Sequence, residues 1–220
     1  MTAASGGAQT AGRPTRLPRS ARRKQLLAAA QQIFVAQGYH AAAMDEIAEQ
    51  AGVSKPVLYQ HFPGKLELYL ALLDTHCDAI IAKVRGAMQA TPDNKERVTG
   101  AVRAYFDFMD HESEAFRLVF ESDLRNDDDV RAVVDRGTRA CVEAIAEVIA
   151  ADTGADKERA LLLAAGLTGL METSARWWLP RKGTVSPDEA VSLMTSLAWR
   201  GISGFPLVDG EQPAATPSVR

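Results

Sequence analysis

The sequence predicts an all-α protein with a small N-terminal domain of three helices and a larger C-terminal helical bundle. Apolar residues recur every three or four positions in most segments between turn residues, which is typical of amphipathic helices. Runs of alternating apolar and polar residues bounded by turn dipeptides, which would predict strands, are not found. Ala and Leu are abundant, and aromatic residues make up only 6% of the chain, which also favours helices.

Composition excludes several classes of protein. With 46% hydrophobic and 24% charged residues among 220, the chain is neither collagen-like nor wholly disordered. The longest uninterrupted apolar run, at 160–167, is far shorter than the roughly 18 residues that a membrane helix needs. The first residues lack the apolar segment of a signal peptide, and two cysteines do not make a disulfide framework. We therefore expect a cytoplasmic protein without a membrane partner.

The N-terminal residues predict a flexible basic arm followed by a helix. The arm, residues 1–18, has low complexity and contains Pro14 and Pro18. The helix is expected over residues 20–37, with Ser20 as its N-cap and Gly38 as a left-handed stop. Its buried stripe repeats at three and four residues: Leu26, Leu27, Ala30, Ile33 and Phe34.

Two short helices are expected next, over residues 44–51 and 55–61. Gly52 is expected to make the turn between them, Val53 to fill the space between the helices, and Ser54 to cap the second helix. This arrangement is a helix-turn-helix. The pattern helix-Gly-helix is by itself a weak signal, since many protein cores contain it.

Longer helices are expected beyond this motif. They begin near residue 65 and then cover 95–111, 114–124, 127–151, 156–179 and 187–204. The expected domains are a flexible basic arm at 1–18, a helix-turn-helix domain at 19–66, a ligand-binding and dimerisation domain at 67–208, and a flexible tail at 209–220.

Charge is unevenly distributed, although the net charge is only −3. Residues 1–65 contain eight Lys or Arg against three Asp or Glu, whereas the remainder contains 17 basic and 25 acidic residues. A basic end of this kind is a hint of a polyanion-binding surface. Chance variation of charge between segments explains the asymmetry equally well.

One dense run of residues carries a family resemblance. It consists of Phe34, Gly38, Tyr39, Met44, Ile47, Ala48, Ala51, Gly52, Val53, Ser54, Lys55, Leu58, Tyr59, Gln60, His61, Phe62, Lys65 and Leu68. With this run, residues 20–68 resemble the N-terminal domain of the TetR family of transcriptional regulators. The resemblance implies a three-helix DNA-binding head on an all-helical effector and dimerisation domain.

In such a head, the third helix would present its N-terminal end, residues 54–60, to the major groove of double-stranded DNA. The free N–H groups and the dipole of that helix favour a nearby phosphate. Lys55 is then a phosphate or guanine contact. Val57 can touch a thymine methyl group, and Gln60 can pair with adenine or with a backbone oxygen.

The resemblance also implies that Tyr59, His61 and Lys65 hold the DNA backbone. Tyr59 could instead pack its ring between helices, and His61 could cap the third helix. The arm arginines either follow phosphates and enter a minor groove, or are only solvated. The candidate DNA-binding residues are Arg13, Arg16, Arg19, Ser54, Lys55, Pro56, Val57, Tyr59, Gln60, His61 and Lys65.

Two pairs of residues depart from the family pattern. Ala42 and Ala43 stand where many members carry a hydroxyl residue, so one common phosphate contact is absent or is made by the backbone. Pro56 and Val57 stand where Gly-Thr is frequent, so base reading relies on methyl contacts, Gln60 and the arm.

Large apolar residues of the C-terminal part lie at helical spacing and either fill a core or enclose an elongated apolar cavity. The adjacent Trp177 and Trp178 cannot share one helix face, so one ring is expected in the cavity or core and the other at a partner surface. The candidate effector-binding residues are Tyr105, Phe106, Met109, Phe116, Phe120, Leu167, Met171, Trp177 and Trp178.

Stretches along most of the chain are similar to the actinobacterial TetR-type regulators of the fatty acid synthase operon, among them residues 54–62, 65–70, 116–123 and 176–179. This similarity implies that long-chain acyl-CoA occupies the cavity and lowers DNA affinity. Composition alone fits any hydrophobic small-molecule effector. Arg117, Arg139 and Arg176 either meet a phosphate or thioester group of the effector or are ordinary surface arginines.

The last two long helices are expected to form a homodimer. Gly166 and Gly169 permit close approach of two backbones, and Leu193 and Leu197 lie on an apolar stripe. A two-fold axis would place two recognition helices roughly 34–36 Å apart, as a palindromic operator requires. Packing within one subunit is the alternative for these residues.

No arrangement typical of an enzyme, a metal site or a cofactor site is found in the sequence. The three aspartates at 127–129 lack the glycine and glutamate of a calcium loop and are expected to begin a helix. We therefore expect a dimeric, ligand-responsive transcriptional regulator of fatty acid biosynthesis genes. The alternatives are a TetR-type repressor of an efflux or catabolic operon, and a helical ligand carrier that does not bind DNA.

Overall fold

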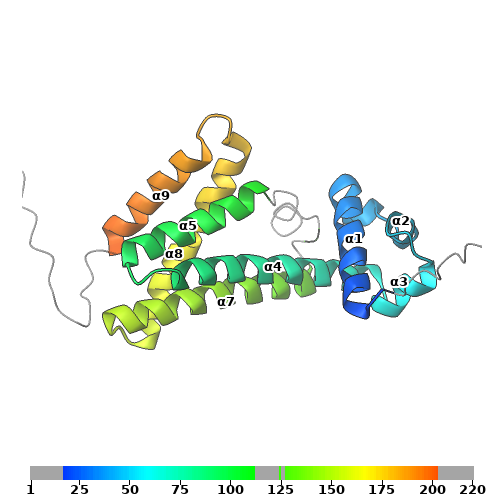
Figure 1. Ribbon diagram of the computed structural model, residues 1–220, viewed down its shortest axis with the longest axis horizontal. Helices are drawn as coiled ribbons and strands as arrows, with labels where there is room; N and C mark the ends of the chain where they lie inside the picture. Colours follow the sequence, from blue (N-terminus) through cyan, green and yellow to red (C-terminus); the bar gives the residue numbers. More distant parts are fainter. Residues whose placement is uncertain (1–16, 112–123, 125–126, 203–220) are drawn as a thin grey trace, which may run out of the picture.

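The computed structural model describes residues 17–111, 124 and 127–202 of the chain, and its regular elements there are all helical. They are α1 (Arg19–Ala41), α2 (Met44–Gln50), α3 (Lys55–His61), α4 (Lys65–Gln89), α5 (Asn94–His111), α7 (Asp128–Thr153), α8 (Lys157–Trp178), the 3₁₀ helix η1 (Leu179–Arg181) and α9 (Pro187–Ile202). Helices α1, α2 and α3 form a small head, and α4 runs from this head into a bundle with α5, α7, α8 and α9 (Figure 1). Within these described ranges, no helix has both the length and the apolar character that a membrane span requires.

Most helix ends lie within two residues of the predicted ones because local signals set them. The Asp127 carboxylate accepts the N–H groups of Asp129 and Val130 at 3.0 and 3.2 Å, so the aspartate run begins α7 as predicted. Gly154 ends α7 with a left-handed φ of 65°. The helix predicted at 114–124 lies outside the described residues except for Leu124, which is in a turn.

The first helix differs from its prediction at both ends. It begins at Arg19, directly after Pro18, so Ser20 lies inside the helix and is not its N-cap. Gly38 interrupts the helix with φ 78° and ψ 167°, a conformation that is essentially restricted to glycine but is not the predicted left-handed helical one. The helical path then resumes and ends at Ala41.

Two hydrophobic cores hold the fold together, and α4 belongs to both. The first core joins the head to Leu68 and Leu72 of α4 and to Val130 and Val133 of α7. The second core lies within the bundle, where the half of α4 around Val84 packs against α5 and α7. Packing therefore continues across the domain boundary expected at residue 66.

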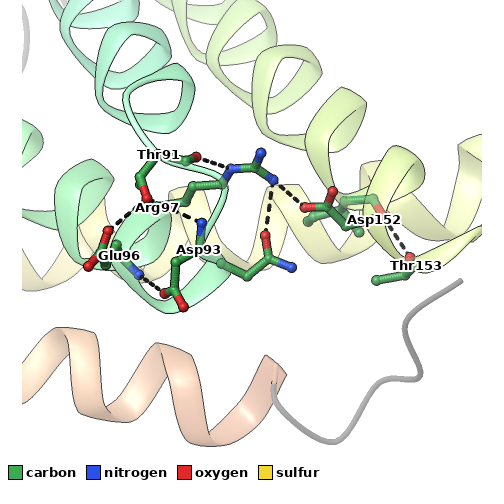
Figure 2. A network of polar contacts seen from close by, with 8 residues as sticks. Thr91, Asp93, Glu96, Arg97, Asp152 and Thr153 are labelled. Carbon is green, nitrogen blue, oxygen red and sulfur yellow. Dashed lines mark hydrogen bonds and ion pairs between the residues drawn. The ribbon is translucent and has the colours of Figure 1, made fainter. Parts of the chain in front are cut away.

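Polar contacts fix the end of the bundle that lies away from the head. The Arg97 guanidinium of α5 donates to the Thr91 carbonyl at 2.8 Å, to the Asn94 side chain at 3.0 Å and to the Asp152 carboxylate of α7 at 2.6 Å (Figure 2). The Thr91 hydroxyl also donates to Glu96 at 2.7 Å. This network holds the turn between α4 and α5 against the end of α7.

Candidate nucleic-acid interface and effector cavity

The turn between α2 and α3 is built largely as the sequence predicts. Gly52 has a φ of 63°, and Val53 is partly buried against the head core. The Gln25 amide donates to the Ala51 carbonyl at 2.7 Å and ties α1 to this turn. Ser54 occupies the N-cap position of α3, but its exposed hydroxyl makes no capping hydrogen bond, contrary to the prediction.

Helix α3 presents one edge to solvent and buries the other. Leu58 is fully buried and Phe62 is 2% exposed, which fixes α3 against the head. The Tyr59 ring is 47% exposed and therefore does not fill a space between helices. The candidates on this edge are Ser54, Lys55, Pro56, Tyr59 and Gln60, which are exposed, and Val57 and His61, which are partly exposed.

Lys55 begins α3 and pairs with the beginning of α2. Its ammonium lies 2.5 Å from the Asp45 carboxylate, and the two side chains are 60% and 58% exposed. Water screens such a pair, and exposed ion pairs contribute roughly 0–1 kcal/mol. A DNA phosphate can therefore replace the Asp45 carboxylate as the partner of Lys55 at little cost.

Basic side chains gather where the beginning of α1 faces the end of α3. Partial desolvation, and then the charges of Arg19, Arg23 and Arg22, lower the pKa of His61 below its usual value. The His61 imidazole is consequently neutral at neutral pH. The Arg23 guanidinium lies 4.4 Å from the centroid of the Phe62 ring. Arg19 is exposed in this cluster, whereas Arg13 and Arg16 lie outside the described residues.

Lys65 has a role within the chain that its motif does not indicate. Its ammonium donates to the carbonyls of Tyr39, His40 and Ala42 at 2.8, 3.2 and 2.9 Å, and it lies 4.6 Å from the centroid of the Tyr39 ring. These carbonyls belong to the end of α1, where intrahelical partners run out. All three N–H donors are engaged within the chain, so Lys65 braces α4 against α1. The contact with the DNA backbone that the resemblance implies stays a prediction.

The beginning of α2 uses backbone and carboxylate groups in place of a hydroxyl. Ala42 is 2% exposed, and the N–H of Ala43 donates to the Glu46 carboxylate at 3.4 Å. Any phosphate contact at this point therefore relies on main-chain N–H groups, as the departure from the family pattern predicts.

A cavity opens between α4, α5, α7 and α8. It contains about 540 Å³ of space free of protein atoms, part of it open to solvent. Its wall is mostly apolar. The lining residues are His76, Cys77 and Ile80 of α4, Tyr105, Phe108 and Met109 of α5, Val134, Gly137, Thr138 and Cys141 of α7, and Thr168 and Glu172 of α8.

The predicted effector-binding residues divide into three groups. Tyr105 and Met109 line the cavity. The others that the structure describes do not line it: Phe106, Met171 and Trp178 are buried in the bundle core, Leu167 packs against that core, and Trp177 is exposed. Phe116 and Phe120 lie outside the described residues. Helical spacing identified buried faces but not which neighbouring helix each face meets.

The two adjacent tryptophans point to different sides, as predicted. The Trp178 indole donates to the Val185 carbonyl at 2.8 Å and is 3% exposed. Trp177 is 60% exposed, and the Arg181 guanidinium lies 4.2 Å from the centroid of its ring.

Sequence reasoning missed the small residues of the cavity wall. A Cβ atom on Gly137 of α7 would lie only 2.8 Å from Cys77 Sγ of α4, so the two helices are in close contact there. Small residues at positions 137 and 141, one helical turn apart, were the available signal. It is weak because such pairs also occur in ordinary helix packing.

The cavity wall has little net charge. Burial raises the pKa of the Cys77 and Cys141 thiols to about 11, so both are protonated at neutral pH. Burial and then the nearby Glu172 carboxylate raise the pKa of the Tyr105 hydroxyl. The Glu172 carboxylate itself lies 2.5 Å from the Arg176 guanidinium. An uncharged ligand segment therefore suits this cavity.

Among the three arginines considered as effector contacts, Arg176 is near the cavity through its pairing with Glu172. Arg139 is exposed on α7, and Arg117 lies outside the described residues. Across those parts of the chain that the structure describes, no group of three or more possible metal ligands occurs.

Helices α8 and α9 present an exposed face with apolar and small residues. Its large members are Leu162 and Trp177 of α8, 75% and 60% exposed, and Leu193 and Leu197 of α9, 54% and 56% exposed. A Cβ atom added to Gly166 or Gly169 would meet no atom within 4 Å. The four candidate dimer residues thus lie on the surface of the single chain, which leaves them available to a second copy.

Comparison with known proteins covers both parts of the chain. Residues 26–72 match the family described as bacterial regulatory proteins, tetR family, and residues 94–201 match the tetracyclin repressor-like C-terminal domain. The chain is 49% identical over 195 residues to the HTH-type transcriptional activator FasR of Mycolicibacterium smegmatis, with 89% of each protein covered. It is 27% identical to the uncharacterized HTH-type transcriptional regulator Rv0472c of Mycobacterium tuberculosis over 80% of this chain and 78% of that protein.

Solved structures with the same architecture are also transcriptional regulators. A TetR-like transcriptional regulator from Rhodococcus sp. RHA1 has a TM-score of 0.65 and 28% identity, covering 86% of this chain and all of that one. The fatty acid degradation regulator FadR from Bacillus halodurans has a TM-score of 0.69 over 82% of this chain and 96% of its own, and its 20% identity shows a shared fold alone. These relatives are named as regulators and not as enzymes.

Proposed function

Because this chain belongs to the TetR family of DNA-binding transcriptional regulators, we propose that two copies bind a palindromic operator and that a hydrophobic effector in the cavity releases them. Long-chain acyl-CoA is the proposed effector, and genes of fatty acid biosynthesis are the proposed targets. The observation that carries this proposal is the position of α4, which contributes to both the head and the cavity wall.

On the DNA side, the exposed edge of α3 offers the chemistry that a major groove requires. Lys55 supplies a cation, Gln60 supplies both a donor and an acceptor, and Tyr59 supplies a phenolic hydroxyl. The cluster of Arg19, Arg22 and Arg23 extends the positive charge beyond the end of α3. Phosphates that flank the groove are the natural partners of such a cluster.

On the effector side, α4 connects the two sites mechanically. Lys65 at its beginning is bonded to the end of α1, and His76 and Cys77, which line the cavity, follow 11 and 12 residues later. At 1.5 Å per residue they lie about 17 Å along the helix from Lys65. A ligand that displaces this part of α4 moves α1 and with it the spacing of the two recognition helices in a dimer.

The choice of acyl-CoA is supported by sequence similarity. The chain resembles the actinobacterial regulators of the fatty acid synthase operon along most of its length, and it is 49% identical to the activator FasR. The apolar wall of the cavity is compatible with an acyl chain. It is equally compatible with the apolar effector of an efflux or catabolic operon, so the test must include that outcome.

The DNA part is tested by fluorescence anisotropy with double-stranded DNA selected from a random library by the full chain. We expect the selected sequences to be palindromic and their affinity to fall steeply with salt. Tyr59→Ala and Lys55→Ala should each weaken binding by about 5- to 100-fold, a loss of roughly 1–3 kcal/mol. Lys157→Ala, at an exposed lysine of the bundle, is the matched control and should bind normally.

The effector part is tested by adding palmitoyl-CoA to the protein–DNA complex. We expect palmitoyl-CoA to release the DNA and CoA alone to leave it bound. Ile80→Phe should fill the cavity and abolish release while preserving DNA affinity. Ile81, the next residue of α4, packs against the bundle core but does not line the cavity, so the Ile81→Phe variant should still be released from DNA by palmitoyl-CoA. Selection of no DNA would favour a carrier and overturn the proposal. DNA binding without a response to palmitoyl-CoA would favour another effector.

A further inference from the structure

The hydroxyl of Thr168 is an unsatisfied polar group in the wall of the cavity. Thr168 is 4% exposed, lines the cavity from α8, and its Oγ1 has no hydrogen-bond partner among the residues that the structure describes. A threonine within a helix commonly donates to the carbonyl one turn earlier, and Thr168 does not do so. A buried hydroxyl without a partner is unfavourable, so this side chain is poised to bond to a molecule that enters the cavity.

The surroundings of Thr168 restrict the chemistry of that molecule. Glu172 lies one helical turn further on the same face of α8, and its carboxylate is already paired with Arg176 at 2.5 Å. A ligand carboxylate at this depth would meet the Glu172 charge and would lose its hydration. The Cys77 and Cys141 thiols of the facing wall carry no charge at neutral pH, so they offer a ligand carboxylate no compensating charge.

We propose that the effector carries an uncharged oxygen on its apolar part, as the thioester carbonyl of an acyl-CoA does, and that Thr168 donates a hydrogen bond to this oxygen. The ligand class is therefore an oxygenated hydrophobic molecule, with a hydroxyl or an ester-type carbonyl at the depth of Thr168, rather than a plain hydrocarbon chain or a free carboxylate. This inference rests on the proposed effector role of the cavity and adds the chemistry that the cavity selects.

The test compares 1-decanol with decane, two probes that differ by one hydroxyl group. Each is delivered from cyclodextrin to the full chain after removal of bound lipid, and binding is followed by displacement of the uncharged dye Nile red. Thr168→Val keeps the shape of the side chain and removes its hydroxyl. We expect this variant to bind 1-decanol about 3- to 10-fold more weakly, the value of one neutral hydrogen bond, and to bind decane as well as wild type does.

Thr195 of α9 provides a matched control. It is 8% exposed, its Oγ1 also lacks a partner in the described part of the chain, and it does not line the cavity. Thr195→Val should raise the unfolding temperature, as Thr168→Val should, because each removes an unpartnered buried hydroxyl. Only Thr168→Val should change the preference for 1-decanol over decane. Thr168→Ser, which retains the hydroxyl, should keep that preference.

The outcomes separate this inference from the proposed function. If Thr168→Val weakens the binding of both probes equally, or of neither, the hydrogen bond is absent and the inference is overturned. Release of DNA by palmitoyl-CoA would in that case still support the effector role of the cavity. If wild type binds neither probe and palmitoyl-CoA does not release DNA, the effector role of the cavity fails, and the inference fails with it.

Discussion

Single residues decide how tightly the head is held to the bundle, and Lys65 is the clearest case. Its ammonium donates to three carbonyls at the end of α1. Hydrogen bonds from a charged donor are stronger than neutral ones, and these satisfy oxygens that the helix leaves unpaired. Lys65 therefore contributes to the stability of the head and sets the angle at which α4 leaves it.

We predict that Lys65→Met lowers the free energy of unfolding by about 1.5–3 kcal/mol, the range for hydrogen bonds to charged groups. Methionine keeps an aliphatic side chain over the Tyr39 ring, so the loss in free energy of unfolding reports the hydrogen bonds of the ammonium alone. Because the ammonium is engaged within the chain, the slope of log affinity against log salt for operator DNA should stay as in wild type. Urea denaturation and binding at several salt concentrations measure the two quantities.

Lys55→Met is the control for this prediction. Lys55 is exposed and has only the weak Asp45 pair to lose, so its removal should leave stability unchanged. If Lys55 contacts a phosphate, removal of its ammonium should lower the magnitude of the salt slope by roughly 0.9 for each copy bound to DNA. If Lys65→Met instead lowers the salt slope and leaves the free energy of unfolding unchanged, Lys65 contacts a phosphate and its hydrogen bonds to the end of α1 do not stabilise the head.

Residues that act through local chemistry could be predicted from the sequence, and those that act at a distance could not. The exposure of the N-terminal end of α3 was expected from the helix-turn-helix pattern and the family resemblance, and Leu58 and Phe62 bury the other side of this helix. The partners of Lys65 lie 23 to 26 residues earlier in the chain. No spacing rule connects positions so far apart, and the family motif indicated a different role.

At the scale of elements, α4 and α7 are in close contact where Gly137 faces Cys77. An added Cβ atom at Gly137 would lie 2.8 Å from Cys77 Sγ and 2.9 Å from Cys77 Cβ, which is closer than van der Waals contact. The absence of a side chain at this position lets the two helices form one wall of the cavity. Substitution of Gly137 should therefore disturb both packing and ligand binding.

We predict that Gly137→Ala destabilises the chain, because overpacking costs about 1–3 kcal/mol and exceeds the roughly 1 kcal/mol that alanine adds to helix stability. Cys77→Ala removes the nearer of the two contacted atoms, so the double variant should recover part of the loss, with a coupling of about 1 kcal/mol. Gly86→Ala, whose Cβ atom would meet nothing within 4 Å, should be neutral or stabilising. Additive effects in the double-mutant cycle would contradict the contact.

The ends of the helices could be predicted from the sequence where capping residues and turns define them. The ends of α7 follow from Asp127 and Gly154, and both could be read from the sequence. The cavity could not be located in the same way, because its lining depends on how four helices rotate against one another. All three of Tyr105, Phe106 and Met109 are buried in the bundle core, but only Tyr105 and Met109 among them line the cavity. Periodicity alone does not separate these two faces.

In the molecule as a whole, α4 runs from the DNA-binding head to the cavity that we propose as the effector site. The head and the bundle have distinct cores, and both α4 and α7 contribute to each of them. Of these two helices, α4 is the one that follows α3 directly in the chain (Figure 1). At the far end, the Arg97 network holds the turn after α4 to α7 (Figure 2). With α4 held there, we expect a displacement of its middle to be transmitted toward the head. This transmission changes operator affinity only if two heads are held at a fixed distance, which requires a dimer.

The proposed dimer can be tested at Gly169 without damage to the single chain. A Cβ atom at Gly169 would meet nothing within 4 Å, and the position lies on the exposed side of α8. Gly169→Leu should therefore leave the folded monomer intact but separate two backbones that approach closely at a two-fold interface. Overpacking of about 1–3 kcal/mol for each copy, or about 2–6 kcal/mol for the pair, should raise the dimer dissociation constant by at least about 30-fold.

Sedimentation velocity should show Gly169→Leu shifting toward a monomer at concentrations where wild type is a dimer. Its affinity for the full palindrome should fall to that for a half-site, because two linked heads gain affinity that one head lacks. Gly86→Leu, on the exposed face of α4 with equally open space, is the control and should remain a dimer. A Gly169→Leu variant that stays dimeric and binds the palindrome as wild type does would place the interface elsewhere, because leucine at the centre of the α8–α9 face cannot be accommodated between closely packed copies.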